Sequence, residues 1–98
     1  MPTRVLVVDD SPTIRKIVQV CLVGAGIELA GASGGEEAVA SLRAGVPDLV
    51  LADAVMPAPD GYALCERIKS GEFGRTPPVV LFADPFVPFD AESVKHPR

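Results

Sequence analysis

Short apolar runs alternate with amphipathic segments along this chain. The apolar runs cover about 4–8, 27–32, 49–52 and 79–82. Three of them, at 5–8, 49–52 and 79–82, contain no polar residue. Short apolar runs rich in β-branched residues are typical of strands that are buried on both faces of a sheet. The pattern therefore predicts four strands, of which the one at 27–32 is the weakest.

The segment after the first predicted strand has the pattern of an amphipathic helix. Ser11 and Pro12 form a helix start, with a capping hydroxyl followed by proline at the first helical position. Glycines at 24 and 26 end the helix. The apolar residues that follow helical spacing, and that we expect to face inward, are Ile14, Ile17, Val18, Cys21 and Leu22.

Two further helices are predicted between the later strands. Residues 33–36 have the spacing of a capping box from Ser33 to Glu36, and Gly45 ends the helix that follows. Its inward side includes Val39 and Leu42. The third helix covers about 61–70, and its inward residues are Leu64, Cys65 and Ile68.

The order of these elements, strand–helix repeated three times and then a strand, predicts an α/β fold. Short strand–helix connections require right-handed crossovers and a parallel sheet with helices on both faces. We expect a doubly wound, flavodoxin-like sheet with about four strands in the order 2-1-3-4. Ligands of such sheets bind at the carboxyl ends of the strands.

Three aspartates stand at those carboxyl ends. Asp9 and Asp10 follow the first strand, and Asp53 follows the third, which is its neighbour in this strand order. Like charges about 4 Å apart repel by about 4 kcal/mol at an effective dielectric constant near 20. A divalent cation removes this repulsion, and oxygen ligands favour Mg²⁺ or Mn²⁺. Taken singly, Asp10 is more simply a helix-start residue and Asp53 a turn former.

Composition excludes several other classes of function. The chain has 98 residues, and we expect one domain over 1–98. A net charge of −4 argues against nucleic-acid binding, and no apolar run is long enough to span a membrane. We expect a cytoplasmic protein. Cys21 and Cys65 lie in apolar stripes without a ligand set, which predicts two buried, reduced thiols.

Two segments carry a resemblance to a known family. They are Val5–Ser11, which contains the Asp-Asp pair, and Asp48–Gly61, which contains Asp53 followed by Met-Pro and Asp-Gly. Both resemble the signature segments of bacterial two-component response regulator receiver domains, including the single-domain members that resemble chemotaxis regulators. The resemblance covers about 4–83.

The resemblance implies that Asp53 is the phosphoacceptor. It also implies that Asp10 binds the metal directly, Asp9 binds it through water, and the Val55 carbonyl is a third protein ligand. The phosphoryl donor would be a histidine kinase or a phosphotransfer protein, in a phosphorelay. A hydrolase acting through an aspartyl phosphate would need an aspartate where Val55 stands, so we expect no enzyme activity.

The sequence departs from the family after the fourth strand. Ala83 stands where the family has a hydroxyl residue, and Val87 stands where it has a lysine. Only three residues separate these two positions, so we expect the fourth helix and most of the fifth strand of the family to be deleted. We expect 83–98 to be a degenerate C-terminal region.

This deletion leaves the fourth strand, Val79, Val80, Leu81 and Phe82, at the edge of the sheet. An apolar edge without charged residues is a template for another strand. We expect a homodimer in which two fourth strands pair across a two-fold axis. The alternative to a phosphorylated receiver is a pseudo-receiver that serves only as a dimerisation or interaction module.

Overall fold

Four parallel strands form one sheet in the order β2-β1-β3-β4. The computed structural model of the chain describes residues 3–82. The strands are β1 (Thr3–Val8), β2 (Ile27–Ala32), β3 (Leu49–Asp53) and β4 (Val79–Phe82). The predicted α/β fold and the predicted strand order are therefore confirmed.

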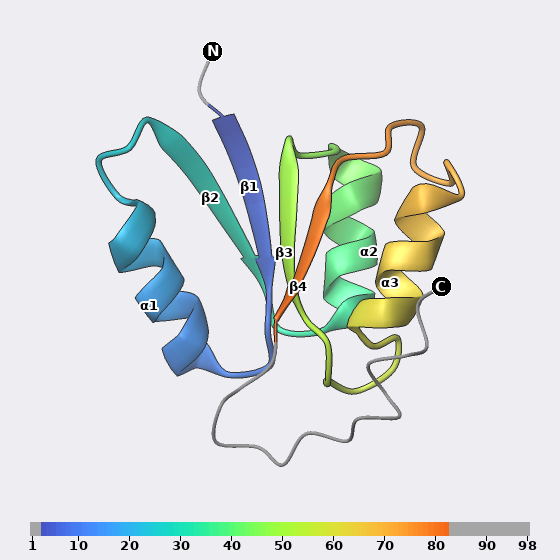
Figure 1. Ribbon diagram of the computed structural model, residues 1–98, viewed down its shortest axis with the longest axis horizontal. Coiled ribbons are helices and arrows are strands. Elements are labelled where there is room, and N and C mark those ends of the chain that lie inside the picture. The colour runs from blue at the N-terminus through green and yellow to red at the C-terminus, as the bar shows by residue number, and fades with distance from the viewer. Residues whose placement is uncertain (1–2, 83–98) are drawn as a thin grey trace.

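Three helices cover the two faces of this sheet. Figure 1 shows α1 (Pro12–Leu22) on one face, and α2 (Gly35–Ala44) and α3 (Gly61–Lys69) on the other. Of the helices within residues 3–82, none has both the length and the apolar character needed to cross a membrane.

The core lies between the sheet and the pair α2 and α3. Strand β1 passes through the centre of the sheet, and its residues 5–8 are all buried. Its even-numbered residues face the α2–α3 side, where they join one cluster with residues of both helices. The largest fully buried side chains of that cluster are Leu6, Val8, Leu42, Val50, Leu64 and Ile68.

Among the described helices, α1 and α3 are capped by a side chain and α2 is not. The Ser11 hydroxyl accepts a hydrogen bond from the Ile14 N–H, and the Asp60 carboxylate accepts one from the Ala63 N–H. The predicted capping box at Ser33 is wrong. Helix α2 begins at Gly35 with Gly34 as its cap, so Ser33 lies one residue outside and donates to the Glu37 carboxylate instead.

The prediction for the inward side of α1 is only partly correct. Ile14, Val18 and Leu22 are half-buried, but Ile17 is 52% exposed and Cys21 is exposed. The reason is that α1 is the only helix on its face of the sheet in the described part of the chain. Its flank therefore meets no neighbouring helix there. Cys65 is buried, as predicted, and both cysteines are free.

Strand β4 is an edge strand within residues 3–82, because its only strand partner there is β3. Val79 and Leu81 pack against the core. Val80 points to the opposite face and is 50% exposed. Burial on both faces, predicted from the apolar run alone, is therefore wrong for this strand, and its predicted place at the edge is confirmed for the described residues.

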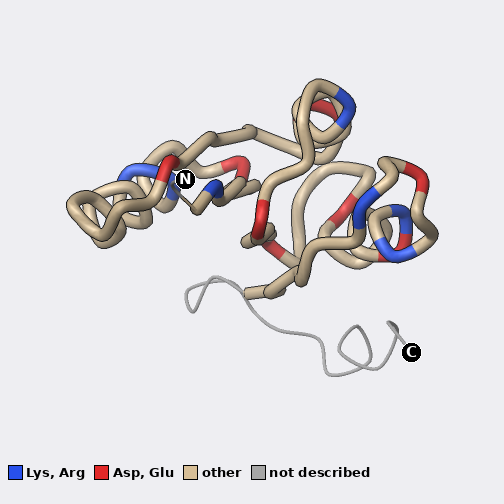
Figure 2. The backbone as a smooth tube through the Cα atoms, turned by 90° about the horizontal axis from the view of Figure 1, so that it is seen from above, with Lys and Arg blue, Asp and Glu red and all other residues tan. Residues whose placement is uncertain are grey.

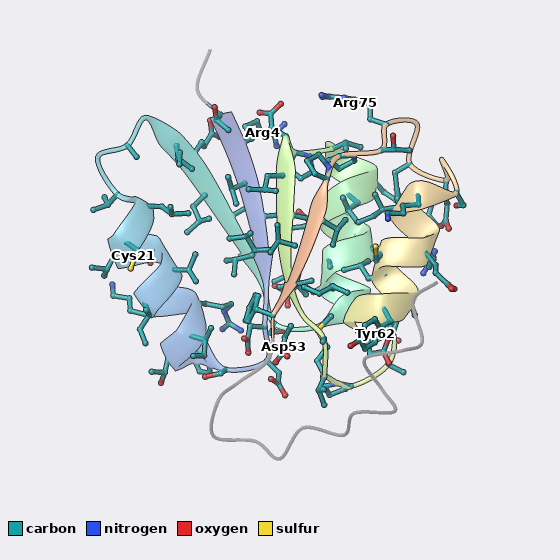
Figure 3. The ribbon with its side chains drawn as sticks, viewed as in Figure 1. Arg4, Cys21, Asp53, Tyr62 and Arg75 are labelled. Atoms are coloured by element: carbon teal, nitrogen blue, oxygen red, sulfur yellow. The ribbon has the colours of Figure 1, made fainter. Side chains whose placement is uncertain are left out.

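Residues of both charge signs are distributed along the described chain (Figure 2). Glu72 pairs with Arg43 at 2.9 Å and also with Arg67. Both guanidinium groups lie over the ring of Phe73, 5.6 and 5.8 Å from its centroid. These contacts tie the end of α2 to the loop after α3, at the opposite end of the sheet from Asp53 (Figure 3).

The start of α2 lies directly against the loop between β3 and α3. A β-carbon added to Gly35 would stand 2.1 Å from the Pro59 carbonyl oxygen and 2.5 Å from Pro59 Cγ. No side chain fits there unless backbone moves. Gly34 next to it has nothing within 4 Å of the same position, so the two glycines form a matched pair.

We predict that Gly35→Ala destabilises the protein by about 1–3 kcal/mol, because the added methyl group overpacks a contact with backbone. Gly34→Ala is the control, and its loss is expected to stay below about 1 kcal/mol. Urea unfolding of both variants measures the difference. Equal stability of the two variants would contradict the close approach of α2 to this loop.

Candidate metal and phosphoacceptor site

Three carboxylates from two strand ends meet at one edge of the sheet. Asp9 and Asp10 follow β1, Asp53 ends β3, and these strands are paired up to Val8 and Ala52. One carboxylate oxygen of each aspartate lies within 4.8 Å of the other two. Figure 3 shows Asp53 at this edge, below the carboxyl ends of the strands. The predicted convergence of Asp9, Asp10 and Asp53 is what the structure shows.

Asp9 is the most buried member of this group, with 2% of its surface exposed. Its N–H donates to the Ala32 carbonyl of β2 at 3.0 Å, which extends the ladder one residue past β1. Its carboxylate Oδ1 accepts a hydrogen bond from the Ser11 N–H at 2.8 Å. The backbone of the turn into α1 thus fixes the orientation of this carboxylate.

Asp53 is also buried, at 6% exposure. Its Oδ1 accepts the N–H of Val55 at 3.0 Å. Gly61, the first residue of α3, lies so close that an added β-carbon would be 2.3 Å from the Asp53 carbonyl oxygen. Gly61 therefore has to be a glycine if α3 is to start against the end of β3.

Burial raises the pKa of Asp9 above the ordinary value of 3.8. The negative charges of Asp53 and Asp10 raise this pKa further, and the Ser11 N–H opposes the change by stabilising the carboxylate. The buried, negatively charged surroundings of Asp9 therefore disfavour its ionised form. A cation among the three carboxylates reverses the sign of the local field.

The donor set fits one hard divalent cation. Three carboxylate oxygens within a few ångströms of one another match the oxygen ligands that Mg²⁺ prefers. Asp10 is exposed, so the site is open to water on one side, and Mg²⁺ retains several waters when it binds proteins.

The remaining predicted site residues have different positions. Val55 is 54% exposed and contacts Asp53 through its N–H. Asp60 caps α3 and is not part of the carboxylate group. Ala83 and Val87 lie outside the described residues.

The sequence did not predict one contact at this site. The Arg15 guanidinium Nη1 donates to the Asp9 carbonyl at 2.7 Å. The only signal in the sequence was the position of Arg15 beside Ile14, at the border of the inward side of α1. Helical spacing alone gives no reason to connect that arginine with the end of the preceding strand.

Known proteins with similar sequences include regulators. A probable transcriptional regulator, ycf27 of Porphyra purpurea, is 42% identical over 66 residues, which are 67% of this chain and 27% of that protein. PilG of Pseudomonas aeruginosa is 32% identical over 80 residues, or 82% of this chain and 59% of PilG. The chain thus spans about a quarter of the first relative and less than two thirds of the second.

Solved structures agree with the same fold. The receiver domain of a histidine kinase from Syntrophus aciditrophicus superposes with a TM-score of 0.81 and 36% identity, covering 94% of this chain and 67% of that one. TrrA of Thermotoga maritima, solved with Mg²⁺ and BeF, gives 0.73 and 33%, covering 83% and 69%. The receiver domain of a sensor histidine kinase from P. aeruginosa, with Mg²⁺ in its active-site cleft, gives 0.73 and 27%, covering 83% and 66%.

The family comparison covers most of the sequence. Residues 5–92 match the response regulator receiver domain, and that range includes both aspartate segments. The match agrees with the parallel sheet in the order β2-β1-β3-β4 and with the aspartates gathered at its carboxyl edge. This chain belongs to the response regulator receiver domain family of two-component signalling.

Proposed function

We propose that Asp53 accepts a phosphoryl group while Asp9, Asp10, Asp53 and the Val55 carbonyl hold a Mg²⁺ or Mn²⁺ ion. The observation that carries this proposal is the convergence of three carboxylates within 4.8 Å at the carboxyl edge of a receiver sheet. Two related structures with Mg²⁺, one of them also with BeF, support the choice of ion.

The chemistry is nucleophilic attack by a carboxylate. A carboxylate oxygen of Asp53 attacks phosphorus of a phosphohistidine, the phosphorus–nitrogen bond breaks, and its electron pair returns to the imidazole. The product on Asp53 is an acyl phosphate. The Val55 N–H holds Oδ1 of Asp53 at 3.0 Å and so fixes the orientation of the carboxylate. The bound cation supplies charge neutralisation of the phosphoryl oxygens.

The phosphoryl donor in this proposal is a histidine kinase or a phosphotransfer protein. We propose that the chain meets this donor in the cytoplasm. We further propose that the domain is a signalling component and not an enzyme that turns over a separate substrate. Charged residues of both signs are distributed along the described chain, and the whole chain carries a net charge of −4. Both features favour a protein partner over nucleic acid.

A second candidate function is a pseudo-receiver that acts as a homodimer. Ala83 and Val87, in place of a hydroxyl and a lysine, favour it because each lost contact to a phosphoryl group weakens the phosphorylated state. The edge of β4 favours it as well. Within residues 3–82 this strand pairs on one side only, and half of the Val80 side chain is exposed.

The first prediction concerns phosphorylation. With Mg²⁺ and acetyl phosphate, intact-mass measurement is expected to show one added phosphoryl group, which Asp53→Asn abolishes. Chelation of the metal is expected to slow the reaction about tenfold or more. Asp60→Asn is the control, because asparagine also caps a helix. If the unmutated protein gains no phosphoryl group, the pseudo-receiver is the better account.

The second prediction concerns pH. Metal binding needs charged carboxylates, and the pKa of Asp9 is raised by burial and by the neighbouring charges. We expect Mg²⁺ affinity, measured by calorimetry, to begin to fall on acidification at a higher pH than an ordinary aspartate would give.

The same pKa fixes the sign of a stability effect. A carboxyl group with a raised pKa in the folded state destabilises the fold as pH rises through that pKa. Without metal, Asp9→Asn is therefore expected to be more stable than the unmutated protein at neutral pH. The difference should vanish below the ordinary aspartate pKa of 3.8. A variant less stable at neutral pH would contradict the raised pKa.

The third prediction concerns association. Val80→Lys places a charge on the exposed side of β4 and is expected to weaken the homodimer about tenfold or more. Val20→Lys is the matched control, since Val20 is 60% exposed on α1. Sedimentation equilibrium distinguishes them. A monomeric unmutated protein, or equal loss in both variants, would exclude the β4 interface.

A further inference from the structure

Arg15 connects α1 with the end of β1, where two of the three aspartates lie. The side chain is half-buried, and its Nη1 donates to the Asp9 carbonyl oxygen at 2.7 Å. Its stem crosses β2 at Gly31. Arg15 Cδ and Nε lie 3.5 and 3.9 Å from the position that a β-carbon on Gly31 would occupy. The glycine leaves the space through which the arginine reaches the strand end.

The hydrogen bond from Arg15 completes the support of Asp9. The N–H of Asp9 is bonded to the Ala32 carbonyl, its carboxylate to the Ser11 N–H, and its carbonyl to Arg15. In the first two bonds the partner is backbone. Arg15 is the one partner among these three that acts through a side chain, so a substitution can remove it without changing the backbone ladder.

The Asp9 carbonyl belongs to the planar peptide group that joins Asp9 to Asp10. A hydrogen bond to that oxygen restricts rotation of the whole peptide, and so restricts the directions in which both carboxylates leave the chain. Groups that orient metal ligands in this way typically change metal affinity by about 10–100-fold.

We propose that Arg15 is a positioning residue for the divalent cation. It fixes the Asp9–Asp10 peptide so that both carboxylates are directed toward Asp53 before the ion arrives. The inference rests on the proposed metal site, and it adds a residue that is not itself a ligand. It also gives Gly31 a role, as the position that keeps the path of the arginine open.

The charge of Arg15 and its hydrogen bond to Asp9 have opposite effects on Mg²⁺ affinity. The direction in which affinity changes when Arg15 is replaced therefore tests the proposal. A positive charge near the site repels Mg²⁺, so removal of that charge alone would strengthen binding. Removal of the positioning bond weakens it. Lys16, the next residue, is exposed and has the same charge. Its substitution removes one positive charge from the same turn of α1 and leaves the Arg15 contact intact.

The experiment compares Mg²⁺ affinity by calorimetry for Arg15→Met, Lys16→Met and Arg15→Lys. Arg15→Met is expected to weaken binding about tenfold, whereas Lys16→Met leaves it unchanged or slightly stronger. Arg15→Lys, which keeps the positive charge and an N–H donor group, is expected to bind Mg²⁺ more tightly than Arg15→Met. Binding by Arg15→Met that equals or exceeds that of Lys16→Met overturns the proposal.

Unfolding in metal-free buffer separates positioning from a general loss of structure. Arg15→Met is expected to unfold close to the unmutated protein while its Mg²⁺ affinity falls. A fall in affinity that is matched by unfolding of the variant at the assay temperature counts against positioning.

A second pair of variants tests the same contact without changing any charge. Gly31→Val fills the space under the Arg15 stem and is expected to weaken Mg²⁺ binding in the same direction. Gly31→Ala is its control, because a β-carbon at 3.5 Å makes an ordinary contact. Equal Mg²⁺ affinity in these two variants overturns the role of the Arg15 path. If the unmutated protein binds no Mg²⁺, the proposed metal site fails, which is a different result from failure of Arg15 alone.

Discussion

Mutual repulsion of three carboxylates is the constraint on which this structure depends. Asp9 and Asp53 are nearly fully buried, and Asp10 lies beside them, so the fold must hold together charges that favour separation. The pairing of β1 with β3 does this. Its register continues to Val8 and Ala52, one residue before each buried carboxylate. Burial of apolar residues on both faces of β1 stabilises the pairing, and the site is therefore maintained at the expense of some stability.

Two helix starts pack closely against the end of β3 and the loop that follows it. Gly61 brings the start of α3 against the Asp53 carbonyl. Gly35 brings the start of α2 against Pro59, which lies in the loop between β3 and α3. Neither approach tolerates a side chain. The loop that follows Asp53 is thus confined between two helix starts, which keeps its backbone N–H groups, including that of Val55, in place beside the carboxylate.

The sequence predicted the strands, the helix order and the three aspartates, because each depends on local periodicity or on the end of an apolar run. It failed where a partner from another element decides the outcome. Ile17 and Val80 lie on apolar patterns but are half exposed, since periodicity shows which side chains share a face and not what covers it. Ser33 does not cap α2, because the helix begins one residue later, at Gly35. The bond from Arg15 to Asp9 depends on the space over Gly31, which only the folded strands define.

The proposed phosphoacceptor, Asp53, is joined to the edge of β4 by backbone contacts. Asp53 is the register partner of Phe82, and the Ala54 N–H donates to the Phe82 carbonyl at 2.8 Å. The residue after Asp53 is therefore hydrogen-bonded to the last residue of the edge strand. If β4 forms the proposed dimer interface, a shift of the backbone at Asp53 is passed to that strand through the hydrogen bond between Ala54 and Phe82. Thermodynamic linkage then requires that any effect of phosphorylation on dimer affinity be matched by an equal effect of dimerisation on the free energy of phosphorylation.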